Sequence, residues 1–131
     1  MPVVIDSSAL VDLVAQTERA PAVARAVGAT DMVAPDVVNP EVLSALMRME
    51  RIGELAPRRA VQAVDDLMDA PVRRFSTAPL LAEAWTLRAN VAAADACYVA
   101  LARVLRCPLV TADRKLSRAP GLGVPLVIVS A

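Results

Sequence analysis

The chain has 131 residues, a length that allows one domain with a hydrophobic core but is short for two domains of ordinary size. It carries 14 basic and 14 acidic residues, and this zero net charge argues against a strongly basic coat for nucleic acid. Hydrophobic residues make up 56% of the chain and the mean hydropathy is +0.50, which predicts apolar surface for a protein partner or a second copy.

The sequence also gives little sign of export or membrane insertion. No apolar run reaches the roughly 18 to 20 residues that a spanning helix needs, and the opening MPVVID lacks the basic region of a secretory signal. The two cysteines, Cys97 and Cys107, fit neither a disulfide framework nor a CxxC zinc site. With no linker or repeat to divide it, we expect residues 1–131 to form a single domain in the cytoplasm.

Short apolar runs alternate with helical patterns along the chain. In chain order, we expect a strand at 2–5, a helix from Ser7 or Ser8 to 15, a helix at 18–27, a strand at 31–34, a helix from 36 or 39 to 51, a helix at 57–68, a strand at 72–75, helices at 78–90 and 93–105, and strands at 109–111 and 124–129. This alternation predicts an α/β fold with a mainly parallel sheet covered by helices on both faces.

Two of the expected helices have local sequence signals. Ser7 or Ser8 can cap the first of them. In the helix that ends at 51, Asn39 can cap the start and Pro40 suits the first helical position. Leu43, Leu46 and Met47 are expected to share one face of that helix.

Three acids stand out against their apolar surroundings. Asp95 is the one charged residue in the stretch VAAADACYVALA, and an unpaired carboxylate taken out of water costs several kcal/mol, roughly. Asp6 and Asp113 each follow a short apolar run where a buried strand is expected to end, which is where parallel sheets bind their ligands. The alternative for each acid alone is a structural role, as a cap or as a complement to a helix dipole.

Glu41, in the first turn of an expected helix, is the fourth member of this acidic set. Two carboxylates about 4 Å apart repel by roughly 4 kcal/mol at an effective dielectric near 20, so four together require a multivalent cation. Oxygen ligands select Mg²⁺, Mn²⁺ or Ca²⁺. Because the chain contains no histidine, the chemistry that remains is metal-assisted hydrolysis, most commonly of a phosphodiester.

Four blocks in this order carry a resemblance to a known family: VIDSSAL at 4–10, EVLSAL at 41–46, DACYVALA at 95–102 and LVTAD at 109–113. Together they resemble a PIN domain and, more narrowly, the VapC toxin ribonucleases of VapBC toxin–antitoxin pairs. The resemblance implies a three-layer sandwich with a central, mainly parallel sheet. It also implies that Asp6, Glu41, Asp95 and Asp113 hold Mg²⁺ or Mn²⁺ for the hydrolysis of RNA.

The resemblance implies roles for other residues and partners as well. Ser7 or Ser8 and Thr111 stand where the family places hydroxyls near the metal, although helix capping and strand-end hydrogen bonds explain them equally. A homodimer and a VapB-like antitoxin are implied, with the antitoxin lying against the helix at 37–49 or the segment at 57–68. Pro40 is expected to delay the start of the helix, so that Glu41 reaches the metal through water.

Basic residues next to Asp113 are the first choice for contact with the RNA. Arg114 and Lys115 follow that acid directly and suit phosphate binding, whereas the alternative for them is a solvated face. Aromatic residues amount to 2% of the chain, so extensive base stacking is not expected.

Two other functions compete with a metal-dependent endoribonuclease. The first is a PIN-like module that binds RNA or protein without turnover. The second is an unrelated α/β protein that handles phosphate, such as a receiver domain or a phosphatase. Against the second stand the missing paired acids of receivers and the missing Asp-x-Asp motif of haloacid-dehalogenase-like phosphatases.

Overall fold

The structure is a computed structural model that describes residues 1–130. Its strands and helices alternate as the sequence predicts. The elements are β1 (Val3–Ile5), α1 (Ser7–Ala15), α2 (Ala20–Val27), β2 (Met32–Pro35), α3 (Val38–Arg51), α4 (Pro57–Asp69), β3 (Val72–Phe75), the 3-10 turn η1 (Ala78–Leu80), α5 (Leu81–Trp85), α6 (Ala93–Leu105), β4 (Leu109–Thr111), α7 (Lys115–Arg118) and β5 (Leu126–Ile128).

The five strands form one sheet in the order β3-β2-β1-β4-β5, and all the neighbouring pairs are parallel. The central strand β1 is buried along its whole length, and Val4 pairs with Val33 on one side and Leu109 on the other. Because parallel strands end at the same edge, the residues that follow β1, β2 and β4 meet there.

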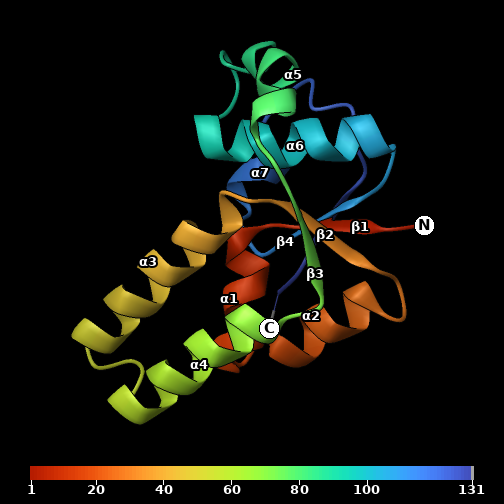
Figure 1. Ribbon diagram of the computed structural model, residues 1–131. Coiled ribbons are helices and arrows are strands. Elements are labelled where there is room, and N and C mark those ends of the chain that lie inside the picture. Colours follow the sequence, from red (N-terminus) through yellow and green to blue (C-terminus); the bar gives the residue numbers. More distant parts are fainter. Residues whose placement is uncertain (131) are drawn as a thin grey trace.

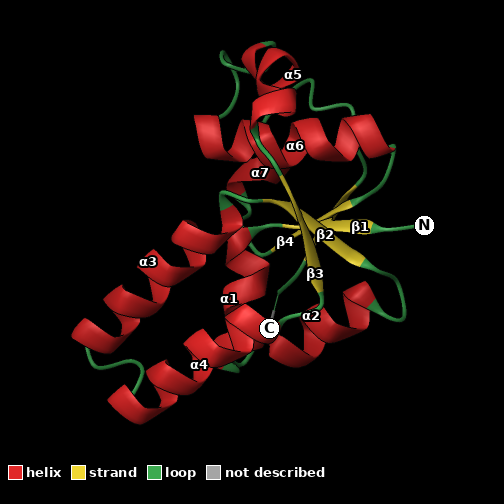
Figure 2. Ribbon diagram, in the orientation of Figure 1, coloured by secondary structure: helices red, strands yellow, loops and turns green. Residues whose placement is uncertain are grey.

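Helices cover both faces of the sheet, which confirms the expected three-layer α/β sandwich (Figures 1 and 2). On one face α6 packs against β1, β2 and β4, and α5 packs on its outer side. On the other face lie α1 and α2. The helices α3 and α4 form a hairpin that packs against α1 and extends away from the sheet (Figure 1).

The apolar residues of α3 form two stripes. Val38, Val42 and Leu46 are buried, at the four-residue spacing of one helix face. Leu43 and Met47 line one groove with Leu46, as expected, but they are 41% and 61% exposed. The helix therefore carries a second apolar stripe that faces outward, toward α4 and the surface.

The start of α3 also corrects the sequence analysis. The helix begins at Val38, and neither Asn39 nor Pro40 occupies the expected place, since no side chain caps this end. Pro40 is tolerated as the third residue because the first backbone N–H groups of a helix lack intrahelical acceptors in any case. It therefore does not delay the helix. The Asn39 side chain instead accepts a hydrogen bond of 3.0 Å from Arg74.

The helix expected at 78–90 is shorter than predicted, and this is the largest difference between an expected and an observed boundary. It consists of η1 and α5 and ends at Trp85. The N–H groups of Thr86, Leu87 and Arg88 bond to carbonyls three residues back, the tighter pattern of a 3-10 turn. The Thr86 hydroxyl adds a 2.6 Å bond to the Glu83 carbonyl, which also competes with a continued α-helix.

Smaller differences occur at the ends of the chain. The last strand is shorter than the expected 124–129 because Gly123 has a left-handed φ of 69° and is followed closely by Pro125. The short helix α7 was missed altogether.

Cys97 and Cys107 are buried and free, as expected. Within residues 1–130, no helix combines the length and the apolar character needed to cross a membrane.

Candidate functional site

The four predicted acids, which we call the acidic edge, lie at the carboxyl-terminal side of the sheet. Asp6 directly follows β1, and Asp113 lies two residues beyond β4. Glu41 is in the first turn of α3 and Asp95 in the first turn of α6. Segments that are far apart in the sequence thus bring acids to one edge because the strands are parallel and the helices start there.

Asp6 is the most deeply buried of the four, at 3% exposed. Its Oδ1 accepts hydrogen bonds from the Ser8 hydroxyl at 2.7 Å and from the Ala9 N–H at 3.0 Å. The second of these makes Asp6 the N-cap of α1, a place that we had assigned to Ser7 or Ser8. Burial raises the pKa of Asp6 to about 6, against the lowering effect of its hydrogen bonds.

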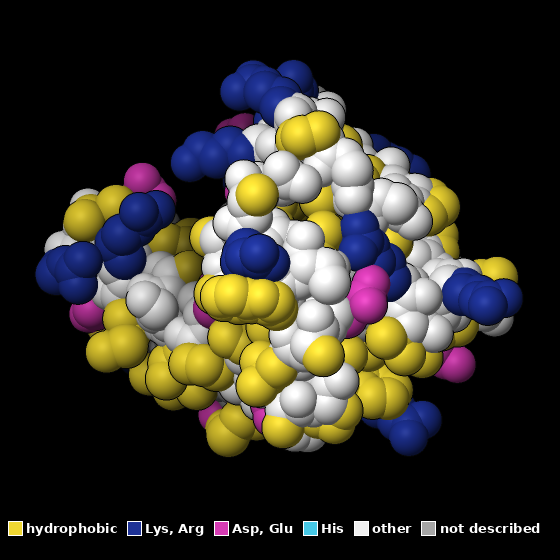
Figure 3. Space-filling model, turned by 90° about the horizontal axis from the view of Figure 1, so that it is seen from above, with side chains coloured by type: hydrophobic (Ala, Val, Ile, Leu, Met, Phe, Trp, Pro, Cys, Tyr) yellow, Lys and Arg dark blue, Asp and Glu magenta, His cyan; other side chains and the backbone are white. Residues whose placement is uncertain are grey.

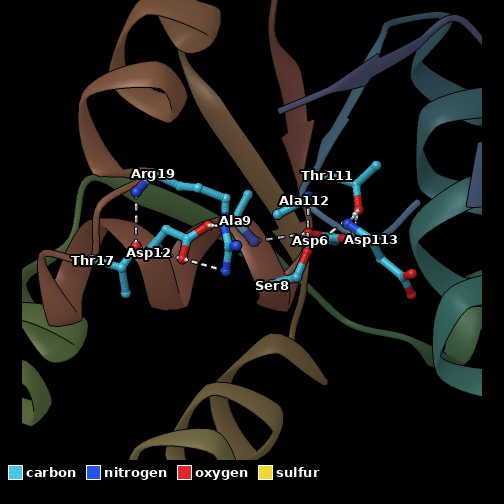
Figure 4. Close-up of polar contacts among 9 residues, drawn as sticks. All are labelled: Asp6, Ser8, Ala9, Asp12, Thr17, Arg19, Thr111, Ala112 and Asp113. Atoms are coloured by element: carbon cyan, nitrogen blue, oxygen red, sulfur yellow. Dashed lines mark hydrogen bonds and ion pairs between the residues drawn. The ribbon is translucent and has the colours of Figure 1, made fainter. Parts of the chain in front are cut away.

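Two hydroxyls connect Asp6 to the segment that carries Asp113 (Figure 4). Thr111, at the end of β4, donates to Asp6 Oδ2 and accepts from the Asp113 N–H at 2.9 Å. Ser8 accepts from the Ala112 N–H at 3.0 Å. The Asp113 carboxylate points away from Asp6 (Figure 4). These hydroxyls therefore bond to Asp6 itself and to the backbone that places Asp113.

Burial and neighbouring negative charges raise the pKa of two carboxyl groups at the acidic edge, Asp95 and Asp6. The pKa of Asp95 is raised first by burial, then by the charges of Asp113 and Glu41, while Lys115 opposes the rise. The charge of Asp95 also contributes to the raised pKa of Asp6. The fold thus holds like charges near one another, an arrangement that a cation would stabilise.

Glu41 bonds to a side chain that the sequence analysis did not select. The hydroxyl of Tyr98, from α6, donates to Glu41 Oε1 at 2.7 Å. Burial and Glu41 raise the pKa of Tyr98, and the side chain of Ser7 opposes this rise. Ser7 is thus placed near the tyrosine hydroxyl, whereas Ser8 is bonded to Asp6.

The basic residues after β4 are also at this edge. Arg114 and Lys115 are both exposed, at the start of α7. The Lys115 N–H donates to Asp113 Oδ1 at 2.9 Å, which fixes the turn between the acid and the helix. The effect of the lysine on the pKa of Asp95 shows that its charge reaches the acidic edge.

The donor set suits a hard divalent cation, since it consists of carboxylate and hydroxyl oxygens. As the side chains are placed, however, no three His, Cys, Asp or Glu residues among 1–130 stand close enough together to hold a metal ion. Asp95 and Asp113 are only partly buried, and therefore have room to rotate. The backbone brings the acids to one edge, but their carboxylates are not gathered around one point.

Sequence reasoning missed two residues here, and both had a signal. Tyr98 lies three residues after Asp95, so in a helix the two share a face. Asp36 directly follows β2, the same position relative to a strand that selected Asp6. The charges of Glu41 and Asp36 both contribute to the raised pKa of Cys97, after burial. Asp36 is thus a further acid at this edge.

A second buried acid belongs to a separate, structural cluster on α1 (Figure 4). Asp12 is 1% exposed, and its carboxylate accepts from the Thr17 hydroxyl at 2.6 Å and from Arg19 Nε at 2.9 Å. These contacts connect α1 to the turn before α2. Both carboxylate oxygens have partners, so this acid is explained by the fold alone.

Comparisons with known proteins agree with the fold. The family model described as PIN domain matches residues 3–122. The chain is 43% identical over 118 residues to Ribonuclease VapC3 of Mycobacterium tuberculosis, covering 89% of this chain and 86% of the relative. It is 37% identical over 128 residues to Ribonuclease VapC1 of the same species, covering 96% of each.

A solved structure shows the same fold. The crystal structure of VapBC2 from Rickettsia felis bound to a promoter DNA fragment matches with a TM-score of 0.70 and 13% identity, covering 99% of this chain and 100% of that chain. The sequence matches span nearly the full length of both proteins, and the predicted acids fall within the region that the family model covers. This chain therefore belongs to the PIN domain family and, within it, to the VapC group.

Proposed function

We propose that this protein is an endoribonuclease that hydrolyses RNA with a carboxylate-bound Mg²⁺ or Mn²⁺, and that it is the toxin of a VapBC toxin–antitoxin pair. The observation that carries the proposal is the acidic edge, where the ends of β1 and β4 and the first turns of α3 and α6 bring four acids from distant segments to one side of the sheet. Membership of the VapC group, whose curated relatives are named ribonucleases, supports the reaction.

In this proposal Asp6, Asp95 and Asp113 bind the cation, and Glu41 binds it directly or through water. The partly buried carboxylates must turn toward the ion, which their exposure permits. Such a cation supplies Lewis-acid activation of water and neutralises charge on the phosphodiester. Ser8 and Thr111 keep the buried carboxylate oriented through the hydrogen bonds described above.

Arg114 and Lys115 are proposed to bind RNA phosphate beside the metal. Their place after Asp113 lets them contact the same backbone that the metal ligands approach. The face seen in Figure 3 carries separate clusters of Lys and Arg between apolar areas, instead of a continuous basic coat. The RNA is therefore expected to be held locally, near the acidic edge, with a modest dependence of binding on salt.

The test is RNA cleavage by the purified protein with Mg²⁺, with Mn²⁺ and with EDTA. We expect cleavage with either cation and none with EDTA. Asp6→Asn, Asp95→Asn and Asp113→Asn should each abolish cleavage, while Asp65→Asn, at an exposed site on α4, should leave it intact. Cleavage retained in any of the three, or in EDTA, overturns the proposal. Undiminished RNA binding without turnover favours a PIN-like binding module instead.

The proposed antitoxin is expected to cover the apolar stripe between α3 and α4. Leu43 and Met47 face outward there, and Val61 and Met68 of α4 are also exposed. Cavities of about 270 and 580 Å³ lie along this hairpin. The large exposed apolar area fits a protein partner, and a homodimer is proposed on the same grounds.

Co-expression with the product of a neighbouring antitoxin gene tests this assignment. Met47→Glu should weaken copurification of the antitoxin, because it places a charge in the apolar stripe. Lys115→Glu, outside the hairpin, is the control. Light scattering of the isolated protein gives its oligomeric state, and a monomer at all concentrations rejects the homodimer.

A further inference from the structure

Tyr98 has an unusual position for a polar side chain. It is fully buried, at 0% exposed, in the middle of α6 against the sheet. Its hydroxyl nevertheless reaches the acidic edge, because it lies one helical turn after Asp95 on the same face. A phenylalanine would fill the core here without needing a hydrogen-bond partner. The hydroxyl is therefore the feature that needs a functional explanation.

The partner of that hydroxyl is Glu41, which lies 57 residues earlier, on α3. The donor–acceptor distance of 2.7 Å is that of a strong bond between a hydroxyl and a carboxylate. The bond links α6, which carries Asp95, to α3, which carries Glu41. Two helices on different layers of the fold are thus connected at the acidic edge.

Glu41 depends on this contact for its orientation. Its side chain is only half-buried and has several rotatable bonds, and its negative charge contributes, after burial, to the raised pKa of Asp95. In the part of the chain that the structure describes, Tyr98 is the one side chain that hydrogen-bonds to this carboxylate. The bond engages Oε1 and leaves Oε2 available to a cation.

We propose that Tyr98 is a positioning residue of the metal site: its hydroxyl holds the Glu41 carboxylate at the acidic edge and so sets the affinity for the divalent cation. This inference rests on the proposed function and deepens it. Glu41 has the longest side chain of the four acids and would otherwise turn into solvent, away from like charge. The effect of Tyr98 on the metal passes entirely through Glu41.

The experiment is a double-mutant cycle on Mn²⁺ binding, measured by isothermal titration calorimetry of the full chain. Tyr98→Phe removes one oxygen and keeps the ring. It should weaken Mn²⁺ binding by roughly 10-fold or more, as loss of a hydrogen bond to a metal ligand commonly does. Glu41→Gln should weaken binding as well. In the Glu41→Gln background, Tyr98→Phe should cause no further loss, because the residue that it positions is already changed.

Cleavage kinetics give an independent readout. At low Mn²⁺ the Tyr98→Phe protein should cleave RNA slowly, and raising Mn²⁺ should restore the rate toward wild type, with little change in the KM for RNA. A merely structural role predicts no such rescue. Val99→Ala, a fully buried neighbour on α6 that packs only in the core, is the matched control. It should lower the melting temperature and leave Mn²⁺ affinity unchanged.

Several results overturn the inference. One is a Tyr98→Phe protein that binds Mn²⁺ as tightly as wild type. Another is a Val99→Ala protein that loses as much Mn²⁺ affinity as Tyr98→Phe. A third is a Glu41→Gln/Tyr98→Phe protein in which the two losses of affinity multiply independently. If wild-type protein binds Mn²⁺ and cleaves RNA while Tyr98→Phe behaves like it, this inference alone fails. If wild-type protein neither binds Mn²⁺ nor cleaves, the proposed function fails with it.

Discussion

Burial of Asp6 makes a specific prediction about stability and pH in the metal-free protein. The pKa of this carboxyl is about 6 in the folded protein and 3.8 in its ordinary state. Such a difference corresponds to about 3 kcal/mol of differential stability. The folded chain holds the proton more tightly than the unfolded chain. The stabilising contribution is therefore fully present below pH 3.8 and is lost as the pH rises through about 6.

The variant Asp6→Asn isolates this contribution. Its amide matches the carboxyl group in size, and its oxygen still accepts from Ser8 and from the Ala9 N–H. The Thr111 hydroxyl, which donates to Oδ2 in the wild type, must turn to accept from the amide NH2, as it would from the protonated carboxyl group. Because the amide has no proton to lose, the variant should be more stable than wild type by up to about 3 kcal/mol above pH 7. The difference should shrink toward zero near about pH 4.

Urea unfolding in EDTA, followed by circular dichroism between about pH 4 and pH 8, measures this difference. Asp65→Asn, an exposed acid on α4, controls for the general effect of removing a charge and should follow wild type. Parallel curves for wild type and Asp6→Asn across the pH range would refute the reasoning. A variant less stable than wild type at pH 8 would do so as well, since it would mean that the hydrogen bonds outweigh burial.

Three further predictions concern the fold. Asp12→Ala should lower the free energy of unfolding by about 1 to 3 kcal/mol, because it removes buried hydrogen bonds to the turn before α2; wild-type stability in denaturant would contradict this. Leu46→Ala should lower the free energy of unfolding by about 2 to 5 kcal/mol, whereas Leu43→Ala should lower it by less than about 1 kcal/mol. Equal losses in the two variants would mean that the buried face of α3 is misassigned. Both cysteines should react slowly with a thiol reagent at mildly alkaline pH, because burial raises the pKa of each. A rapid reaction in the folded protein would contradict this prediction.

Much of the architecture could be predicted because local signals agreed with it. Short apolar runs bounded by polar residues became strands, and the acids just past them, Asp6 and Asp113, lie at the carboxyl-terminal edge of the sheet as expected. The parallel sheet then follows from alternation of strands and helices. What these signals specify is the placement of backbone segments.

Features that depend on tertiary contacts could not be read in the same way. Periodicity placed Leu43 on one helix face with Leu46 and Met47, but it could not show that α3 packs on α1 in a way that leaves Leu43 exposed. The capping role went to Asp6 because its carboxylate, and not a serine hydroxyl, lies against the Ala9 N–H. The spacing of Tyr98 to Asp95 placed both on one helix face but could not show the bond of Tyr98 to Glu41, because only the fold brings those two residues together.

The central place of β1 in the sheet has a consequence for synthesis of the protein. Val4 and Ile5 pair with Leu109 and Val110. The strand β1 therefore gains its second neighbour only after β4 has been synthesised. Domains generally fold as units while the chain emerges from the ribosome. A nascent chain that has not yet released the segment through residue 113 therefore lacks part of the acidic edge, and the four acids come together only after that segment has folded against β1.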